Sequence, residues 1–243
     1  MAFMAEAKIR LYVDQALDAG QAVAVTEAQA NYLFNVMRLD VGAALLLFNG
    51  RDGEWRATVA QVGRRAGVLM CQAQTAPLRM PPDIWLIFAP IKKARSDFVV
   101  EKAVELGAAR ILPVQTRYTN ERLREDKLRA HAVEAAEQCG ATFVPPVADL
   151  VPLDRLLTTW PADRRLLWCD ETLAGKPTPL SGPKDSPWAI LIGPEGGFAP
   201  DEQTRLRALP YIVPLSLGPR TLRADTAAVA ALTLWQAALG DWG

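Results

Sequence analysis

The spacing of hydrophobic positions changes along the chain and predicts two regions. Up to about residue 75, short apolar runs alternate with turn residues, as in strands joined by tight turns. From about residue 84, apolar runs alternate with segments of helical periodicity. The stretch at 75–83 contains several prolines, which disfavour both helix and central strand. We therefore predict one domain over residues 1–75 and a second over residues 76–243.

The pattern of the first region favours a small β-barrel with one helix. Thr26 begins the sequence Thr-Glu-Ala-Gln, a capping box in which Gln29 reaches back to the Thr26 backbone, so we expect a helix from there to about Met37. Residues 51–53, Arg-Asp-Gly, form a turn between two strands of a hairpin. The expected strands are 10–13, 22–25, 45–50, 54–62 and 67–73.

The second region alternates strands with helices, which predicts a parallel sheet with helices on both faces. The expected strands are 84–89, 110–114, 165–169, 188–193 and 212–217. The expected helices are 96–106, 126–138 and 225–239. Another helix should begin at Pro200, because proline suits a first helical turn and Asp201 and Glu202 are favourable beside the positive end of the helix dipole.

Composition narrows the function classes only modestly. The chain has 243 residues, 50% of them hydrophobic, and its formal net charge is zero, so an RNA site would need a local cluster of basic residues. The three cysteines are far apart, and the single histidine, His131, makes a histidine-based metal site or a Ser-His-Asp triad improbable. Neither a signal peptide nor an apolar run of about 20 residues is present, so we expect a cytoplasmic protein without a metal or a membrane contact.

Two loops that follow predicted strands carry the candidate chemistry. The first is Gly193–Phe198, with the sequence GPEGGF, and the second is Leu217–Ala227, with the sequence LGPRTLRADTA. In open α/β sheets, ligands bind beyond the carboxyl ends of the strands, and glycines there let the backbone approach a ligand closely. The sequence has neither a GxxxxGK[ST] motif nor a GxGxxG motif after its first sheet strand. We therefore predict one binding site that both loops build largely from main chain, and we expect a branched residue at Gly196 to obstruct it.

These loops resemble those of a known family. LIGPEGGFAPDE (191–202) and LSLGPRTLRADTA (215–227) are similar to the cofactor loops of the 16S rRNA uridine N3-methyltransferases, which belong to the SPOUT class. The resemblance continues through FVVEKAVELGAARILPV (98–114) and EAAEQCG (134–140). NYLFNVMRLDVG (31–42) resembles part of the family's PUA-like RNA-binding barrel.

The resemblance implies an α/β fold: an N-terminal PUA-like β-barrel, then a SPOUT-type parallel-sheet domain with a C-terminal trefoil knot. It implies S-adenosylmethionine as cofactor, N3 of a uridine in 16S rRNA as methyl acceptor, the rRNA or small ribosomal subunit as partner, and a homodimer. The expected cofactor-binding residues are Leu191, Ile192, Gly193, Pro194, Glu195, Gly196, Gly197, Leu215, Ser216, Leu217, Gly218, Leu222, Thr226 and Ala227.

The chain departs from the family pattern at several positions. The family usually has histidine near Asn31 or Tyr32 and arginine near Asn35. It commonly has arginine where this chain has Ala141, and a longer carboxylate where this chain has Asp225. These departures bear on RNA contacts in the barrel and on the role of Asp225.

Arginines in the second loop are the main catalytic candidates. Arg220 and Arg223 could bind phosphate or stack on a base, and a cation there would stabilise the anion left when uridine N3 loses its proton. Asp225 is a further catalytic candidate, and it or Glu171 could accept that proton. The alternative is that these charges lie on the solvated surface. The candidate RNA-binding residues are Arg38, Lys92, Lys93, Arg95 and Arg117.

Two other functions fit the same features. One is a different SPOUT reaction, such as methylation of the ribose 2′-oxygen. The other is a ribosome-assembly factor that binds rRNA without catalysis, although such a factor would not need intact cofactor loops.

Overall fold

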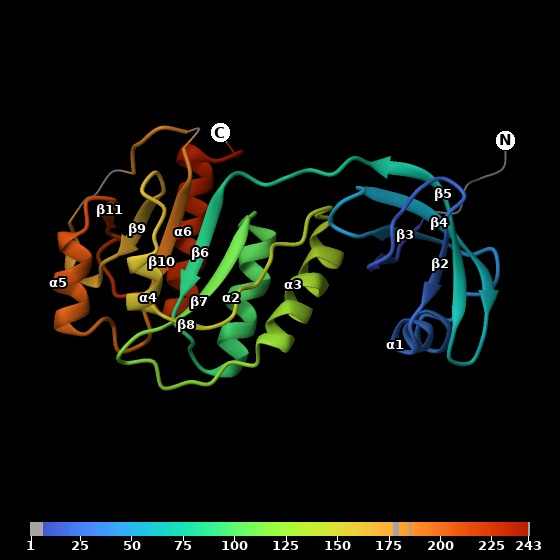
Figure 1. The fold of residues 1–243 in the computed structure, drawn as a ribbon, viewed down its shortest axis with the longest axis horizontal. Coiled ribbons are helices and arrows are strands. Elements are labelled where there is room, and N and C mark those ends of the chain that lie inside the picture. The colour runs from blue at the N-terminus through green and yellow to red at the C-terminus, as the bar shows by residue number, and fades with distance from the viewer. Residues whose placement is uncertain (1–6, 177–179, 185, 243) are drawn as a thin grey trace. The chain divides into compact units, whose positions relative to one another are not determined.

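The structure is a computed structural model that describes residues 7–176, 180–184 and 186–242, with only the backbone of Lys93 described. It consists of two compact units (Figure 1). The first holds the chain up to Met80 together with Ala136–Val144, and the second holds Pro81–Ala135 and the chain from Pro145 onward. Within the described residues, no helix is long and apolar enough to cross a membrane.

The first unit contains a five-stranded mixed sheet in the order β1-β3-β4-β5-β2. β1 pairs with β3 in parallel, and the other neighbours are antiparallel. Alternate side chains, such as Leu45 and Leu47, enter a core that is closed by Leu33. The predicted strands are confirmed, and the last one extends into the proline-containing stretch. The strands are β1 (Arg10–Tyr12), β2 (Ala22–Val25), β3 (Ala44–Phe48), β4 (Glu54–Val62) and β5 (Gly67–Ala76).

The capping box at Thr26 starts a helix, as predicted. The Thr26 side chain accepts a hydrogen bond from the Gln29 backbone, and the Gln29 side chain accepts one from the Thr26 backbone. The regular helix is short, because α1 (Glu27–Ala30) continues as a π-helix, η1 (Asn31–Val36). Arg38 follows with φ 56°, a left-handed conformation that is uncommon outside glycine.

Residues 136–144 join the first unit through Arg10, a contact that the sequence did not predict. They include the end of helix α3 (Glu125–Cys139). The Arg10 guanidinium donates to the carbonyl oxygens of Ala136, Glu137 and Ala141, and it pairs with Glu54 at 2.7 Å. A cation suits the end of a helix, where carbonyl groups lack partners.

The second unit contains a six-stranded parallel sheet in the order β11-β9-β10-β6-β7-β8, which confirms the predicted α/β architecture. The chain builds β6, β7 and β8 outward in one direction and then returns to the other side of β6. Such a reversal places a ligand crevice at the carboxyl ends of the central strands. The strands are β6 (Ile84–Phe88), β7 (Arg110–Gln115), β8 (Val151–Pro152), β9 (Arg165–Cys169), β10 (Trp188–Ile192) and β11 (Ile212–Leu215).

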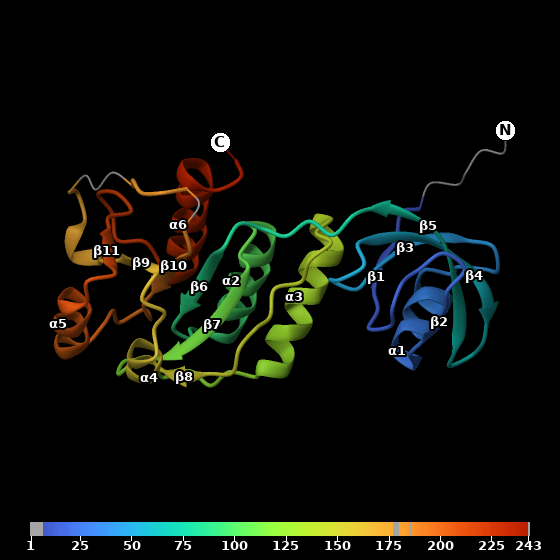
Figure 2. The same ribbon diagram turned by 45° about the horizontal axis from the view of Figure 1, so that its top comes forward.

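Helices cover the sheet, and two of them matter for the site. Figure 2 shows α2 (Lys93–Glu105) beside α6 (Ala224–Leu239), and the two pack against each other. The helices α4 (Leu153–Thr158) and α5 (Pro200–Ala208) supply apolar side chains to a core cluster with Trp168 and Leu191. Sequence periodicity did not predict the short elements β8 and α4. The trefoil knot stays a prediction, because strand order does not trace the threading of the chain.

Arg164 ties together the amino ends of three strands, at the sheet edge opposite to the carboxyl ends. Its side chain is buried, donates to the Trp188 carbonyl oxygen at 2.8 Å, and forms two hydrogen bonds to the Asp83 carboxylate at 2.9 and 2.8 Å. Its guanidinium also lies 3.6 Å from the centroid of the Trp85 ring. One side chain thus joins the starts of β6, β9 and β10.

We expect Arg164→Ala to lower the free energy of unfolding by about 2–3 kcal/mol, because charge-assisted hydrogen bonds in a buried position are lost. Urea denaturation measures this loss. Arg165→Ala is the matched control: that guanidinium lies 5.4 Å from the Trp188 ring centroid on an exposed side chain, and its removal should cost less than about 1 kcal/mol. Equal losses in both variants would contradict the assignment.

Candidate active site

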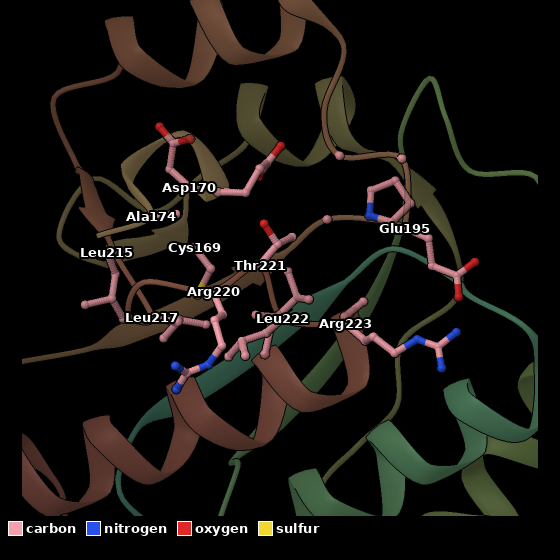
Figure 3. Close-up of a pocket in the computed structure, with 18 of the residues that line it drawn as sticks. Cys169, Asp170, Ala174, Glu195, Leu215, Leu217, Arg220, Thr221, Leu222 and Arg223 are labelled. Atoms are coloured by element: carbon pink, nitrogen blue, oxygen red, sulfur yellow. The ribbon is translucent and has the colours of Figure 1, made fainter. Parts of the chain in front are cut away.

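A cavity of about 570 Å³ lies at the carboxyl ends of β9, β10 and β11 (Figure 3). This volume falls within the roughly 300–1,000 Å³ that small-molecule and cofactor sites occupy. Both predicted loops border it, and a third loop after β9 completes it. The predicted cofactor residues that line the cavity are Ile192, Gly193, Pro194, Glu195, Gly196, Gly197, Leu215, Leu217, Gly218, Leu222 and Ala227.

Three of the predicted cofactor residues do not line the cavity. Leu191 points into the core cluster under the sheet, because side chains alternate along β10. Ser216 lies between β11 and the second loop, outside the cavity lining, and Thr226 lies in the first turn of α6 with an exposed side chain.

The glycines of the first loop are required by its own packing. The Gly197 backbone N–H donates to the Pro194 carbonyl oxygen at 2.9 Å, and φ at Gly197 is +70°. A Cβ at Gly197 would lie 2.5 Å from the Glu171 Oε1, and one at Gly193 would lie 2.7 Å from the Phe198 ring. Side chains at either position would displace neighbours that shape the cavity.

Gly196 differs from these two glycines. A Cβ built there would lie 3.6 Å from the Cβ of Tyr118, which is ordinary contact, and φ at Gly196 is not positive. The expectation that a branched residue at Gly196 obstructs the cavity stays a prediction, because the contact with Tyr118 concerns the Cβ alone. The Gly196 backbone still borders the cavity.

The loop after β9 was missed as a cavity wall. It contributes Asp170, Glu171 and Ala174, next to Cys169 at the end of β9. Its backbone meets the second loop, since the Gly175 N–H donates to the Gly218 carbonyl oxygen at 3.0 Å. The signal was present, because the strand at 165–169 was predicted and the rule that ligands lie beyond the carboxyl ends of strands applies to it equally.

Asp170 holds this third loop in place. The residue is only 4% exposed. Its carboxylate accepts hydrogen bonds from the backbone N–H and the hydroxyl of Thr172 at 3.0 and 2.7 Å. The Arg207 guanidinium from α5 pairs with it at 3.2 Å. The Asp170 charge is thus compensated within the protein.

Cys169 forms a neutral part of the cavity. Burial, reinforced by the Glu171 carboxylate, raises the pKa of the Cys169 thiol to about 12. The thiol therefore stays protonated at neutral pH, which disfavours a nucleophilic role. Glu171 and Glu195 also border the cavity, and within the described residues neither forms an ion pair.

The catalytic candidates separate into two groups. Arg220 and Arg223 line the cavity, and Figure 3 shows their side chains extending to different sides of it, with Glu195 on the side of Arg223. Asp225 does not line the cavity and instead pairs with Arg95, which was a candidate RNA contact, at 2.5 Å.

The other RNA candidates lie in different surroundings. Lys92 lines the cavity, and we call Lys92 and Arg223 the basic rim. Arg117 is exposed and pairs with Asp201 at 2.7 Å. Arg38 belongs to the first unit, and the side chain of Lys93 lies outside what the structure describes. Among the described residues, no group of histidine, cysteine, aspartate and glutamate side chains could hold a metal ion.

Comparison with known proteins identifies the family. A model described as an RNA methyltransferase domain matches residues 79–236, and one described as an RNA methyltransferase PUA domain matches residues 25–69. The ribosomal RNA small subunit methyltransferase E of Synechocystis is 30% identical over 86% of this chain and 71% of its own length. The chain belongs to this methyltransferase family. Its relative of the same name from Rickettsia conorii is 28% identical over 92% of this chain and 93% of that protein.

Solved structures of relatives share the fold and hold the cofactor. Ribosomal RNA small subunit methyltransferase E from Neisseria gonorrhoeae, bound to S-adenosyl methionine, matches with a TM-score of 0.87 and 26% identity over 97% of this chain and 99% of that one. A putative methyltransferase from Legionella pneumophila, in complex with the bound cofactor, matches with a TM-score of 0.84 and 31% identity over 96% and 98%.

We expect Gly197→Ala to weaken binding of S-adenosylhomocysteine by roughly 10-fold or more, because the new Cβ is strained at positive φ and displaces the Glu171 carboxylate, which lines the cavity. Gly196→Ala should leave the affinity within about twofold, since its Cβ only touches Tyr118. Isothermal titration calorimetry measures both. A greater loss from Gly196→Ala than from Gly197→Ala would refute this account of the loop.

Proposed function

We propose that this chain transfers a methyl group from S-adenosylmethionine to N3 of a uridine in 16S rRNA. The observation that carries the proposal is the cavity at the carboxyl edge of the parallel sheet, which is built from the two loops that resemble those of the uridine N3-methyltransferases. The relatives named as ribosomal RNA small subunit methyltransferases support it across nearly the whole chain.

The lining of the cavity suits this cofactor. Apolar side chains, among them Ile192, Leu217 and Leu222, offer a surface for an adenine ring, and the backbone of the glycine loops offers polar groups for its edge. The Glu171 carboxylate suits the positive charges of the methionine part. When bound, S-adenosylmethionine supplies a methyl group that its sulfonium already activates.

The protein must then hold the uridine base and stabilise the anion that forms when the base loses a proton. Uridine N3 must lose a proton, and the resulting charge spreads onto the neighbouring carbonyl oxygens. We assign Arg220 and Arg223 to the stabilisation of this charge, with Lys92 as a further cation on the rim. Glu171 borders the cavity and remains the candidate for proton acceptance, whereas Asp225 does not reach it.

The first unit is proposed to bind RNA without taking part in the chemistry. Its match to an RNA methyltransferase PUA domain supports this role. Arg38 and the π-helix before it are the residues that we assign to RNA contact, since backbone conformations of this kind cluster at functional positions. An rRNA substrate would also favour a cytoplasmic location.

We further propose that the chain forms a homodimer through its second unit. Leu234 on α6 is 46% exposed and Phe98 on α2 is 38% exposed, on two helices that pack together. Exposed large apolar side chains on adjoining elements favour a protein partner. We expect sedimentation velocity to give the mass of two chains, and Leu234→Glu to shift it toward one. A single-chain mass for the parent protein would exclude the dimer.

The arginines of the second loop test the proposed chemistry. Arg223→Ala should lower single-turnover methylation at saturating 16S rRNA by about 10²-fold, the scale of losing one preorganised charge donor, and Arg220→Ala tests its neighbour in the same way. Affinity for S-adenosylhomocysteine should change little, because backbone supplies most of that pocket. Arg205→Ala is the control, because this α5 residue pairs with Asp154 outside the cavity lining.

Nucleoside mass spectrometry of the modified rRNA decides the reaction itself. We expect 3-methyluridine, whereas a methyl group on a ribose oxygen, or no methylation by the parent protein, would refute the proposed function. Parental single-turnover rates in both arginine variants would remove these residues from the chemistry and leave them as RNA-binding residues.

A further inference from the structure

Two helices begin beside each other at the cavity. Lys92 is the residue that precedes the first turn of α2, and Arg223 is the residue that precedes the first turn of α6. These two residues form the basic rim, and no side chain caps either helix end. The position of each rim cation is therefore set by the first turn of the helix that follows it.

An ion pair joins these two first turns. Arg95 is the third residue of α2 and Asp225 is the second residue of α6, and their side chains meet at 2.5 Å between Nη1 and Oδ2. The side chains are 31% and 15% exposed, so solvent screens the pair only in part. The second carboxylate oxygen of Asp225 accepts a hydrogen bond from the Thr226 backbone at 2.9 Å.

The pair lies in the two helix turns whose backbone hydrogen bonds hold the rim residues. The Arg95 backbone N–H donates to the Lys92 carbonyl oxygen at 2.7 Å, and the Ala227 N–H donates to the Arg223 carbonyl oxygen at 2.7 Å. A shift between the first turns of α2 and α6 would therefore move Lys92 and Arg223 relative to each other.

The charges at the two helix ends oppose such a shift only while Asp225 is present. Lys92, Arg95 and Arg223 are all cationic, and the N-terminus of each helix adds a partial positive charge. The Asp225 carboxylate in the first turn of α6 meets Arg95 in the first turn of α2 and offsets part of this positive charge. Without it, the same groups repel one another.

We propose that Asp225 and Arg95 form a positioning pair that holds Lys92 and Arg223 at the spacing in which they meet the target base. This inference rests on the proposed function and changes two expectations drawn from the sequence. Asp225 does not line the cavity and both of its oxygens are engaged, so it acts through Arg223 and does not accept the proton. The Arg95 guanidinium is bound to Asp225, so its task is within the protein and not on the RNA.

The test is a double-mutant cycle on the full-length protein. Arg95→Ala, Asp225→Ala and the double variant are compared for affinity to S-adenosylhomocysteine and for single-turnover methylation at saturating rRNA. We expect each single change to lower the rate by about 10- to 100-fold, the effect of a small misplacement near the reacting groups, with cofactor affinity within about twofold. The double variant should be no slower than the slower single variant, because both changes break one contact.

A charge-swapped variant separates positioning from proton transfer. Arg95→Glu combined with Asp225→Arg restores the attraction but has no carboxylate at position 225. We expect it to be at least about 5-fold faster than Asp225→Ala. A swapped protein no faster than Asp225→Ala overturns the inference, as does a cofactor affinity that falls in parallel with the rate.

A second ion pair on α2 serves as the control. Lys102 and Glu105 meet at 2.6 Å with side chains 30% and 36% exposed, and neither borders the cavity. Glu105→Ala should leave the methylation rate unchanged. Parental activity in the Arg95 and Asp225 variants refutes the positioning pair alone, whereas absence of methylation by the parent protein refutes the proposed function.

Discussion

The parallel ladder that joins β11, β9, β10 and β6 is the constraint on which the site depends. Parallel strands place their carboxyl ends at one edge, so loops that follow residues 88, 169, 192 and 215 meet there although they are far apart in sequence. The chain's own backbone hydrogen bonds continue this order past the strands: the Ala89 N–H donates to the Ile192 carbonyl oxygen, and the Asp170 N–H donates to that of Leu215. The cavity is thus a consequence of strand direction and order.

Charge is distributed unequally around this cavity. Glu171 comes from the loop after β9 and Glu195 from the first loop, whereas Lys92, Arg220 and Arg223 come from the starts of α2 and α6 and from the second loop. The proposed reaction brings together a cationic methyl donor and a base that becomes anionic. An acidic wall and a basic rim in one cavity suit these two partners, although the chain as a whole has zero formal charge.

The two edges of the sheet have different tasks. At the amino edge, the two terminal nitrogens of Arg164 donate hydrogen bonds within the protein, and its guanidinium packs on Trp85. At the carboxyl edge, glycines and unpaired charges replace such packing, because a ligand must enter. Two ion pairs at that edge are formed within the protein: Asp170 pairs with Arg207, and Asp225 pairs with Arg95. The second of these joins the helix turns that follow the basic rim, which is why a positioning role follows from it.

The sequence by itself determined the class of fold and the identity of the main loops. Period and composition predicted the strands at 54–62 and 165–169 to the residue, and the capping box placed the start of α1 at Thr26. The two glycine-containing loops were predicted to share one site because each follows a predicted strand, and ligands bind beyond the carboxyl ends of parallel strands. The short elements β8 and α4 were not predicted, since segments of two and six residues are too short to show a hydrophobic periodicity.

Only the tertiary structure decided which charges face the cavity. Arg95 and Asp225 are 130 residues apart, and nothing local in either segment indicates that they pair. The same is true of Arg10 and the end of α3, and of Gly197 and Glu171. The local sequence pattern indicates only the secondary structure that a residue and its chain neighbours form. The partner of a side chain depends on which elements pack together, and here that partner separates a residue that meets the substrate from one that holds the site in place.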